Sequence, residues 1–307
     1  MKIGMVGLGR MGANMTVRIM QHGHEVVAWD RDAESVNGVS AQGAQGVGSL
    51  EELVRALDPP RAVWIMLPSG DPTELTIKAL ADLLDRGDTI LDGGNSNFRF
   101  AMADAERLQR ERGIDFIDVG TSGGIWGLKE GYCLMVGGEP DAVKRLEPIF
   151  VALAPAGGYA HVGPVGAGHF VKMVHNGIEY GLLQAYAEGF ALMNKADEFA
   201  LDLHQIAEVW RYGSVVRSWL LDLTAMALSN QEGFSKIRGF VEDSGEGRWT
   251  IDEAVNRGVP TPVMAISLFE RFQSREPDSF AARIIAALRN EFGGHKFLEE
   301  SADADTH

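Results

Sequence analysis

The chain opens with a glycine-rich turn between a predicted strand and a predicted helix. The apolar run of residues 2–6 leads directly into Gly7-Leu8-Gly9-Arg10-Met11-Gly12, a G-x-G-x-x-G pattern. The first glycine permits a tight turn, the second lets the backbone approach a pyrophosphate, and the third lets the helix pack on the strand. The unpaired N–H groups at the helix N-terminus then face the phosphates. The pattern predicts a dinucleotide-binding βαβ unit.

Asp30 directly follows the second predicted strand, residues 25–29. It lies about 20 residues beyond the glycines, where a carboxylate accepts hydrogen bonds from ribose hydroxyls and repels a 2′-phosphate. Arg31 follows at once, and an arginine there can hold a 2′-phosphate or stack on adenine. We therefore expect NAD as the cofactor, with NADP as the alternative.

Short apolar runs alternate with amphipathic stretches in the first half of the chain. Strands alternating with helices predict a parallel sheet with helices on both faces. The fold class is therefore α/β, with an N-terminal Rossmann-type doubly wound sheet followed by an all-helical domain. The strands are expected at residues 2–6, 25–29, 62–66, 89–91 and 115–118, with further strands in GYCLMVGG and GGYAHVG, and the helices at 10–22, 72–84, 98–112 and 141–153.

The pattern changes after residue 163. Residues 165–195 contain no proline and are almost continuously apolar, which predicts one long buried helix. Shorter helices are expected at 203–211, 216–227, 250–256, 262–272 and 279–289. We expect a dinucleotide-binding domain at 1–165, a helical substrate-binding and oligomerisation domain at 166–298, and a disordered tail at 299–307.

Charge and composition exclude several classes of partner. The formal net charge is −15, whereas nucleic acids and anionic membranes need a basic surface. No apolar run reaches the roughly 18 residues of a membrane span, and the N-terminus lacks the pattern of a signal peptide. The single cysteine, Cys133, is expected to be buried in a strand and fits a reducing cytoplasm. No metal site is expected.

Three predicted strand ends carry turn residues suited to a ligand. In doubly wound sheets, ligands bind beyond the carboxyl ends of the strands. Each turn is also ordinary loop chemistry, but three on one edge of the sheet favour a binding site. The turns contain Leu67 and Pro68 beside the expected nicotinamide ribose, Asn95 and Ser96 in LDGGNSN, and Ser122, Gly123 and Gly124 in DVGTSGG.

The segment KMVHNGIEY, residues 172–180, places four polar groups in the long apolar helix. At about 100° per residue they share one arc of the helix surface. The four are Lys172, His175, Asn176 and Glu179. A salt-bridged surface would show the same spacing. However, Gly177 and Gly181 lie mid-helix, where glycine is unfavourable, so another group is expected to approach closely.

These residue types suit acid–base chemistry next to a nicotinamide. A lysine made neutral by burial can take the proton of a hydroxyl group as hydride leaves the carbon. Lys172 would be this base. A plain dehydrogenase needs only one such group, so Glu179 suggests a second proton transfer, to carbon, after loss of CO₂.

The chain resembles the β-hydroxyacid dehydrogenases and, within them, the 6-phosphogluconate dehydrogenase family. MVGLGRMGANM matches the superfamily signature and KMVHNGIEYG the decarboxylating branch, while DGGNS, TSGG, DSGEGRWT and RNEFGGH recur in order. The resemblance implies NAD(P)-linked oxidative decarboxylation of 6-phospho-D-gluconate to D-ribulose 5-phosphate. It also implies that Lys172 is general base and later acid, and that Glu179 protonates the sugar carbon.

The resemblance further assigns residues that hold the substrate. Asn95 would serve both cofactor and substrate, and the phosphate pocket would combine residues of two subunits, which implies a homodimer or homotetramer. The implied substrate-binding residues are Asn95, Ser122, Gly123, Gly124, His175, Asn176, Tyr180 and Arg271, with Arg289 and His295 from a neighbouring subunit.

The chain departs from the long family members in its length, in the DSGEGRWT loop and in TSGGIWG, where Ile125 and Trp126 replace an acidic pair. It is shorter, like the short bacterial form. Ser244 and Glu246 stand where long members place a phosphate-contacting lysine and threonine, and a carboxylate near a phosphate is unfavourable.

Two alternative functions are weighed. One is a non-decarboxylating dehydrogenase of a small 3-hydroxy acid, of the 3-hydroxyisobutyrate or tartronate semialdehyde type. Such a dehydrogenase would give no common role in substrate binding or catalysis to Glu179, Arg271, Arg289 and His295. The other is a non-catalytic nucleotide sensor, which would be expected to have lost the lysine, asparagine and glutamate of the helix.

Overall fold

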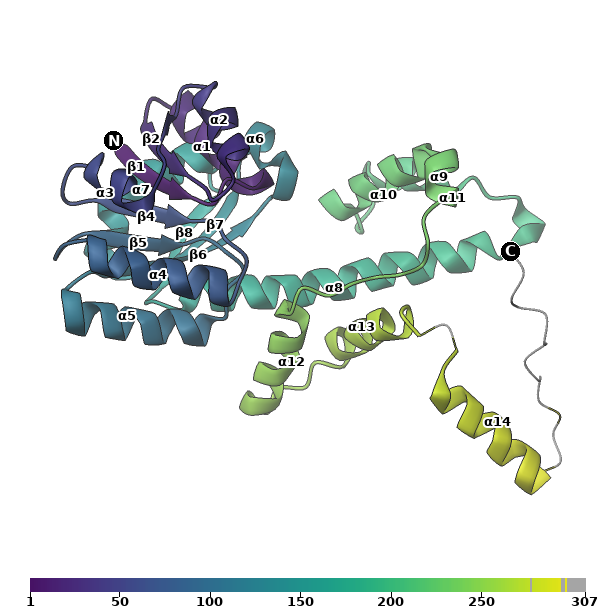
Figure 1. Cartoon of the computed structure of the whole chain (residues 1–307). Helices are drawn as coiled ribbons and strands as arrows, with labels where there is room; N and C mark the ends of the chain where they lie inside the picture. Colours follow the sequence, from purple (N-terminus) through teal and green to yellow (C-terminus); the bar gives the residue numbers. More distant parts are fainter. Residues whose placement is uncertain (277, 294–295, 297–307) are drawn as a thin grey trace. The chain divides into compact units, whose positions relative to one another are not determined.

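The computed structural model describes residues 1–276, 278–293 and 296. The chain divides into two compact units, Met1–Ile178 and Glu179–His307. Helix α8 (Ala167–Asn194) runs through the division (Figure 1). The domain boundary at 165/166 stays a prediction, and the predicted tail 299–307 lies outside the described residues.

The first unit contains an eight-stranded sheet in the order β3-β2-β1-β4-β5-β6-β7-β8. All described pairings are parallel except that of β6 with β7. Strands β2 and β3 are added on one side of β1, and β4 and the following strands on the other side. Doubly wound sheets bind dinucleotides at such a switch point, here between β1 and β4. The strands are β1 (Lys2–Val6), β2 (Glu25–Trp29), β3 (Gln45–Gly46), β4 (Ala62–Ile65), β5 (Thr89–Asp92), β6 (Asp115–Ser122), β7 (Cys133–Gly137) and β8 (Tyr159–Gly163).

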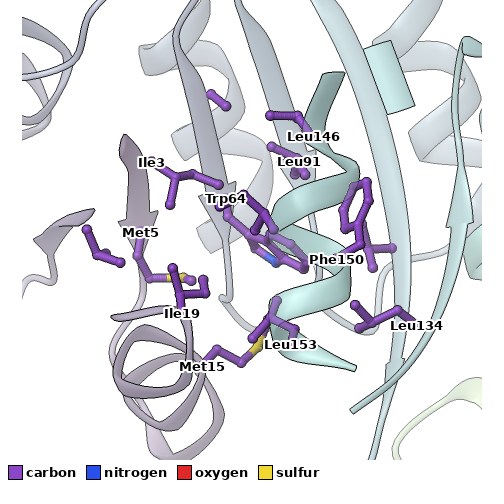
Figure 2. Close-up of a cluster of buried hydrophobic side chains, with 14 of the residues drawn as sticks. Ile3, Met5, Met15, Ile19, Trp64, Leu91, Leu134, Leu146, Phe150 and Leu153 are labelled. Carbon is purple, nitrogen blue, oxygen red and sulfur yellow. The ribbon is translucent and has the colours of Figure 1, made fainter. Parts of the chain in front are cut away.

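Helices cover both faces of this sheet because successive strand residues point to opposite faces. In β4, Trp64 packs with residues of α1 and α7 (Figure 2), whereas Val63 and Ile65 pack with α3, α4 and α5. Trp64 meets Phe150 edge to face, with ring centroids 5.8 Å apart. The predicted fold class is confirmed. The helices are α1 (Arg10–Gln21), α2 (Ala33–Ser40), α3 (Leu50–Arg55), α4 (Asp71–Leu83), α5 (Phe98–Arg112), α6 (Gly127–Glu130) and α7 (Pro140–Leu153), with a 3-10 turn at Gly124–Trp126.

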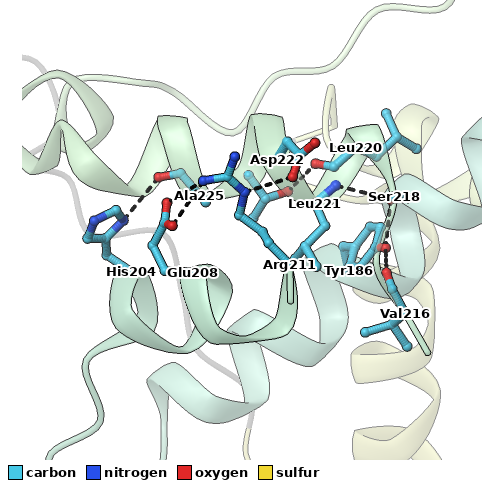
Figure 3. A network of polar contacts seen from close by, with 11 residues as sticks. Tyr186, His204, Glu208, Arg211, Val216, Ser218, Leu220, Leu221, Asp222 and Ala225 are labelled. Carbon is cyan, nitrogen blue, oxygen red and sulfur yellow. Dashed lines mark hydrogen bonds and ion pairs between the residues drawn. The ribbon is translucent and has the colours of Figure 1, made fainter. Parts of the chain in front are cut away.

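The second unit is helical throughout its described part. Its small core joins Phe190 of α8 to α9 and α10. Figure 3 shows the polar contacts beside this core, where Arg211 binds Glu208 at 2.8 Å and Asp222 at 2.7 Å. Ser218 caps α10 by accepting from the N–H of Leu221. The helices are α9 (Leu203–Trp210), α10 (Trp219–Ser229), α11 (Gln231–Ser235), α12 (Glu246–Arg257), α13 (Pro262–Gln273) and α14 (Phe280–Gly293), with a 3-10 turn at Asp197–Phe199.

Two expectations about burial are wrong. Helix α8 is continuous as predicted but is not buried along its length, since Leu182 is 45% and Leu192 is 76% exposed. Cys133 is exposed as the first residue of β7. Apolar neighbours in the sequence suggest that a residue is buried, but they do not reveal what covers it in the folded protein. Among the helices that the structure describes, none combines the length and apolar character needed to cross a membrane.

Candidate active site

The glycine turn between β1 and α1 has the geometry of a phosphate-binding loop. Gly7 has φ +92°, and a Cβ there would lie 2.5 Å from the carbonyl oxygen of Met66. A Cβ on Gly12 would lie 2.0 Å from the carbonyl oxygen of Gly7. By contrast, no described atom lies within 4 Å of a Cβ placed on Gly9, the N-cap of α1. Packing thus requires glycine at positions 7 and 12, while Gly9 leaves open space that fits a pyrophosphate at the helix N-terminus.

Asp30 is tied to this loop. Its Oδ2 accepts from the N–H of Leu8 at 2.6 Å, and its Oδ1 accepts from the N–H of Asp32 at 2.9 Å. Asp30 and the exposed Arg31 line a cavity of about 400 Å³ together with residues of α2 and β3. The chemistry of this lining fits the adenosine end of a dinucleotide.

The ends of β4 and β5 meet beside the glycine loop. A Cβ on Gly7 would lie 2.8 Å from Cδ2 of Leu67, and a Cβ on Gly94 would lie 2.6 Å from the carbonyl oxygen of Leu67. The carbonyl of Pro68 accepts from the hydroxyl of Thr73 at 2.8 Å. These contacts bring the two predicted turns together.

Asn95 and Ser96 differ in burial on the β5 turn. Asn95 is exposed, whereas the Oγ of Ser96 is buried without a hydrogen-bond partner among the described residues. Ser96, which the sequence already places with Asn95 in a turn suited to a ligand, is therefore the residue of this turn with an unused buried hydroxyl.

The start of α8 is anchored to β6 by a buried carboxylate that the sequence analysis did not identify. Asp118 is fully buried, and its two oxygens accept from the N–H groups of Gly166 at 2.6 Å and His169 at 2.7 Å. It therefore caps α8 from another element. Burial raises the pKa of Asp118, while His169 and the two N–H donors act in the opposite direction.

Lys172 lies one turn beyond this anchor. A Cβ on Gly120 of β6 would lie 2.5 Å from Cβ of Lys172, so helix and strand touch here. Lys172 Nζ donates to Asn176 Oδ1 at 2.8 Å, and His175 Nδ1 lies 3.0 Å from the same oxygen. Lys172 and His175 are half-buried, and Asn176 is 9% exposed. Three of the four predicted polar groups therefore meet around one amide oxygen.

The remaining predicted residues of the substrate carboxylate site follow β6. Ser122 ends the strand two residues beyond Gly120, and Gly123 and Gly124 have φ values of +127° and +53°. These backbone angles lie in the region that favours glycine. The half-buried Glu179 lies on α8 seven residues beyond Lys172, about 10 Å along the helix axis.

Tyr180 and Arg271 meet in the second unit. The Arg271 guanidinium carbon lies 3.4 Å from the ring centroid of Tyr180. Tyr180 is 6% exposed, and its Oη has no hydrogen-bond partner among the described residues. Arg289 is exposed on α14, while His295 lies outside the described residues. Across residues 1–276, 278–293 and 296, no cluster of three or more His, Cys, Asp or Glu side chains could hold a metal ion.

Comparisons with known proteins agree along the chain. Residues 2–163 match the NAD binding domain of 6-phosphogluconate dehydrogenase, and residues 168–305 match the C-terminal domain of the same enzyme. An NAD(+)-dependent, decarboxylating 6-phosphogluconate dehydrogenase of Haloferax volcanii is 42% identical over 299 residues, which cover 96% of this chain and 98% of that protein.

Two solved structures extend the comparison. The 6-phosphogluconate dehydrogenase of Plasmodium falciparum gives a TM-score of 0.82 at 27% identity, covering 99% of this chain and 67% of that one. A 3-hydroxyisobutyrate dehydrogenase of Mycobacterium tuberculosis gives 0.72 at 23% identity, covering 94% and 99%, and shares the fold. With both of its parts matched, the chain belongs to the 6-phosphogluconate dehydrogenase family.

Proposed function

We propose that the protein oxidises and decarboxylates 6-phospho-D-gluconate to D-ribulose 5-phosphate and CO₂, with NAD favoured over NADP. The observation that carries the proposal is the position of Lys172. It is held against Gly120 of β6, beside the predicted carboxylate site at Ser122, and it shares Asn176 with His175. Glycine-loop geometry and Asp30 support NAD as the cofactor.

In the proposed first step, Lys172 takes the proton of the C3 hydroxyl as hydride leaves C3. Bound NAD supplies the hydride acceptor. Asn176 and His175 orient the hydroxyl, while Ser122, Gly123 and Gly124 hold the C1 carboxylate through hydroxyl and backbone N–H groups. The product is a 3-keto acid, from which C1 leaves as CO₂ because the ketone accepts the electron pair of the broken bond.

The second step returns protons to the enediol that decarboxylation leaves. Lys172, now protonated, gives its proton to the C3 oxygen as CO₂ departs. Glu179, two turns along α8, then protonates the carbon that carried the carboxylate, while Lys172 takes back the proton of the C3 hydroxyl, which leaves the ketone of D-ribulose 5-phosphate. Tyr180 and Arg271 hold the phosphate, with Arg289 and His295 contributed by a neighbouring subunit.

The test is an initial-rate assay of 6-phosphogluconate with NAD and with NADP, in which CO₂ is measured together with reduced cofactor. Lys172→Ala should lower kcat about 100- to 10,000-fold, the usual contribution of a general base, without weakening NAD binding. Lys129→Ala is the control, since its amine pairs with Glu130 on the surface. Reduced cofactor formed without CO₂ by the wild-type protein would contradict the decarboxylation.

We also propose that the protein is a cytoplasmic homodimer or homotetramer. Exposed apolar side chains support association, among them Ile285 and Leu288 of α14 and Phe269 of α13, at 59%, 55% and 58% exposure. A single cysteine is consistent with a reducing compartment. Light scattering after size-exclusion chromatography would measure the assembly, and a monomeric mass would reject it.

A further inference from the structure

Three arginines gather around two aromatic rings in the second unit, and we call them the arginine cluster. Arg271 lies 3.4 Å from the ring centroid of Tyr180. Arg248 and Arg275 lie 4.4 and 5.2 Å from the ring centroid of Phe272. In a chain with a formal net charge of −15, this is a local concentration of guanidinium groups, which are donors suited to an anion.

One carboxylate orders two members of the cluster. Asp243 is 5% exposed and accepts from Arg248 Nε at 2.7 Å, Arg248 Nη2 at 2.9 Å and Arg275 Nη2 at 2.7 Å. The Arg248 hydrogen bond, with that of Arg275, holds the pKa of Asp243 well below its ordinary value. The third nitrogen of Arg248, Nη1, donates to no atom of the described residues, and the side chain is 51% exposed. Arg248 is therefore held in place with one face open.

A second observation points to a ligand at the same place. The Oη of Tyr180 is buried without a partner among the described residues. Its ring lies on the first turn of α12, where a Cβ on Gly247 would meet Tyr180 Cε2 at 2.5 Å. Gly245, the N-cap of α12, offers no side chain to the first N–H groups of the helix. A buried hydroxyl, a helix N-terminus and the guanidinium group of Arg248 converge, and each of them suits an anion.

The acidic neighbours do not close this site. Glu246 is 2% exposed, and its Oε2 accepts from the hydroxyl of Ser244 at 2.5 Å, so this carboxylate is engaged inside the loop. The backbone carbonyl of Glu242 accepts from Arg271 Nη1 at 3.0 Å. Asp252 acts on Arg248 electrostatically, and with Asp243 it offsets part of the positive charge. Among the described residues, Arg248 Nη1 and Tyr180 Oη have no hydrogen-bond partner, and Arg271 donates through Nη1 alone.

We propose that Arg248 binds the phosphate monoester end of the substrate, together with Tyr180 Oη and Arg271. This inference rests on the proposed function and adds to it a residue for the phosphate. A guanidinium fork suits phosphate oxygens better than a point charge does, so lysine at position 248 should replace it only in part.

Arg248→Gln tests the proposal against Arg257→Gln, a control on the same helix. Arg257 pairs with Glu253 and is 57% exposed. With 6-phosphogluconate, Arg248→Gln should raise KM about 10- to 100-fold, the usual effect of losing a hydrogen bond to a charged group, with little change in kcat. Competitive inhibition by inorganic phosphate should weaken by the same factor. Arg248→Lys should fall between Arg248→Gln and wild type, and Arg257→Gln should match wild type.

Unphosphorylated D-gluconate separates phosphate binding from a structural effect. Its kcat/KM should be the same in Arg248→Gln and wild type, and equal losses for both substrates would overturn the proposal. So would a KM for 6-phosphogluconate equal to that of Arg257→Gln. If the wild-type protein forms no NADH from 6-phosphogluconate, the proposed function fails. Calorimetric titration of 6-phosphogluconate into wild type and Arg248→Gln would still decide the role of Arg248, since equal affinities would overturn it.

Discussion

Replacing Gly120 by alanine should separate α8 from β6 and displace the proposed general base. The added Cβ would lie 2.5 Å from Cβ of Lys172 and 2.6 Å from the carbonyl oxygen of Gly168. Non-bonded carbon atoms settle at about 3.5–4.0 Å, so α8 must move by about 1 Å. A displacement of about 1 Å can lower a rate about 100-fold, and overpacking costs about 1–3 kcal/mol of stability.

The assay is the initial rate of NADH formation from 6-phosphogluconate, with NAD affinity measured separately. We expect kcat of Gly120→Ala to fall about 100-fold with NAD affinity unchanged, since the glycine loop is untouched. Gly38→Ala in α2 is the matched control, because no described atom outside the local helix backbone lies within 4 Å of the new Cβ. It should gain about 0.5–1 kcal/mol of stability and keep its rate. A wild-type kcat in Gly120→Ala would refute the reasoning.

Three further predictions concern carboxylates. Asp30→Asn should raise kcat/KM with NADP relative to kcat/KM with NAD, because it removes a charge that repels a 2′-phosphate. An unchanged ratio of the two values would reject the role of Asp30 in cofactor choice. Because burial raises the pKa of Asp118, the folded state takes up a proton on this carboxyl at higher pH than the unfolded chain does. The stability of the wild type in urea should therefore gain from Asp118 as the pH falls towards about 4, and Asp118→Asn should lack that gain. Because Arg248 and Arg275 lower the pKa of Asp243, this carboxylate stabilises the folded state at neutral pH. Asp243→Asn should therefore have a lower free energy of unfolding than the wild type at neutral pH, and the two values should converge below about pH 4.

The parts of the fold that depend on neighbours in sequence could be predicted. The β1–loop–α1 unit follows from glycine spacing, and α5 has the predicted bounds because its cap and its periodic apolar residues are local. The sequence pattern predicts that α12 starts at residue 250, whereas the helix begins at Glu246. DSGEG resembles a loop, and the helix begins inside it.

The contacts that position the site could not be predicted, because they join distant segments. Nothing in DFIDVGTS marks Asp118 as the cap of a helix that begins about 50 residues later. Gly120 and Gly168 likewise read as ordinary glycines, although each lies in a backbone-to-backbone contact between β6 and α8. The sequence identified the polar groups of α8 from their spacing, but the partners that hold that helix in place required the three-dimensional structure.

The register of β6 and β7 offers a way to watch the substrate arrive. Ser122 lies directly opposite Cys133, and opposite residues of an antiparallel pair project from the same face of the sheet. Cys133 is exposed and is the sole cysteine of the chain. A thiol-reactive fluorophore would therefore label the wild-type protein at one position, without engineered residues. Its emission would report on the turn proposed to bind the carboxylate, even in a variant that forms no NADH.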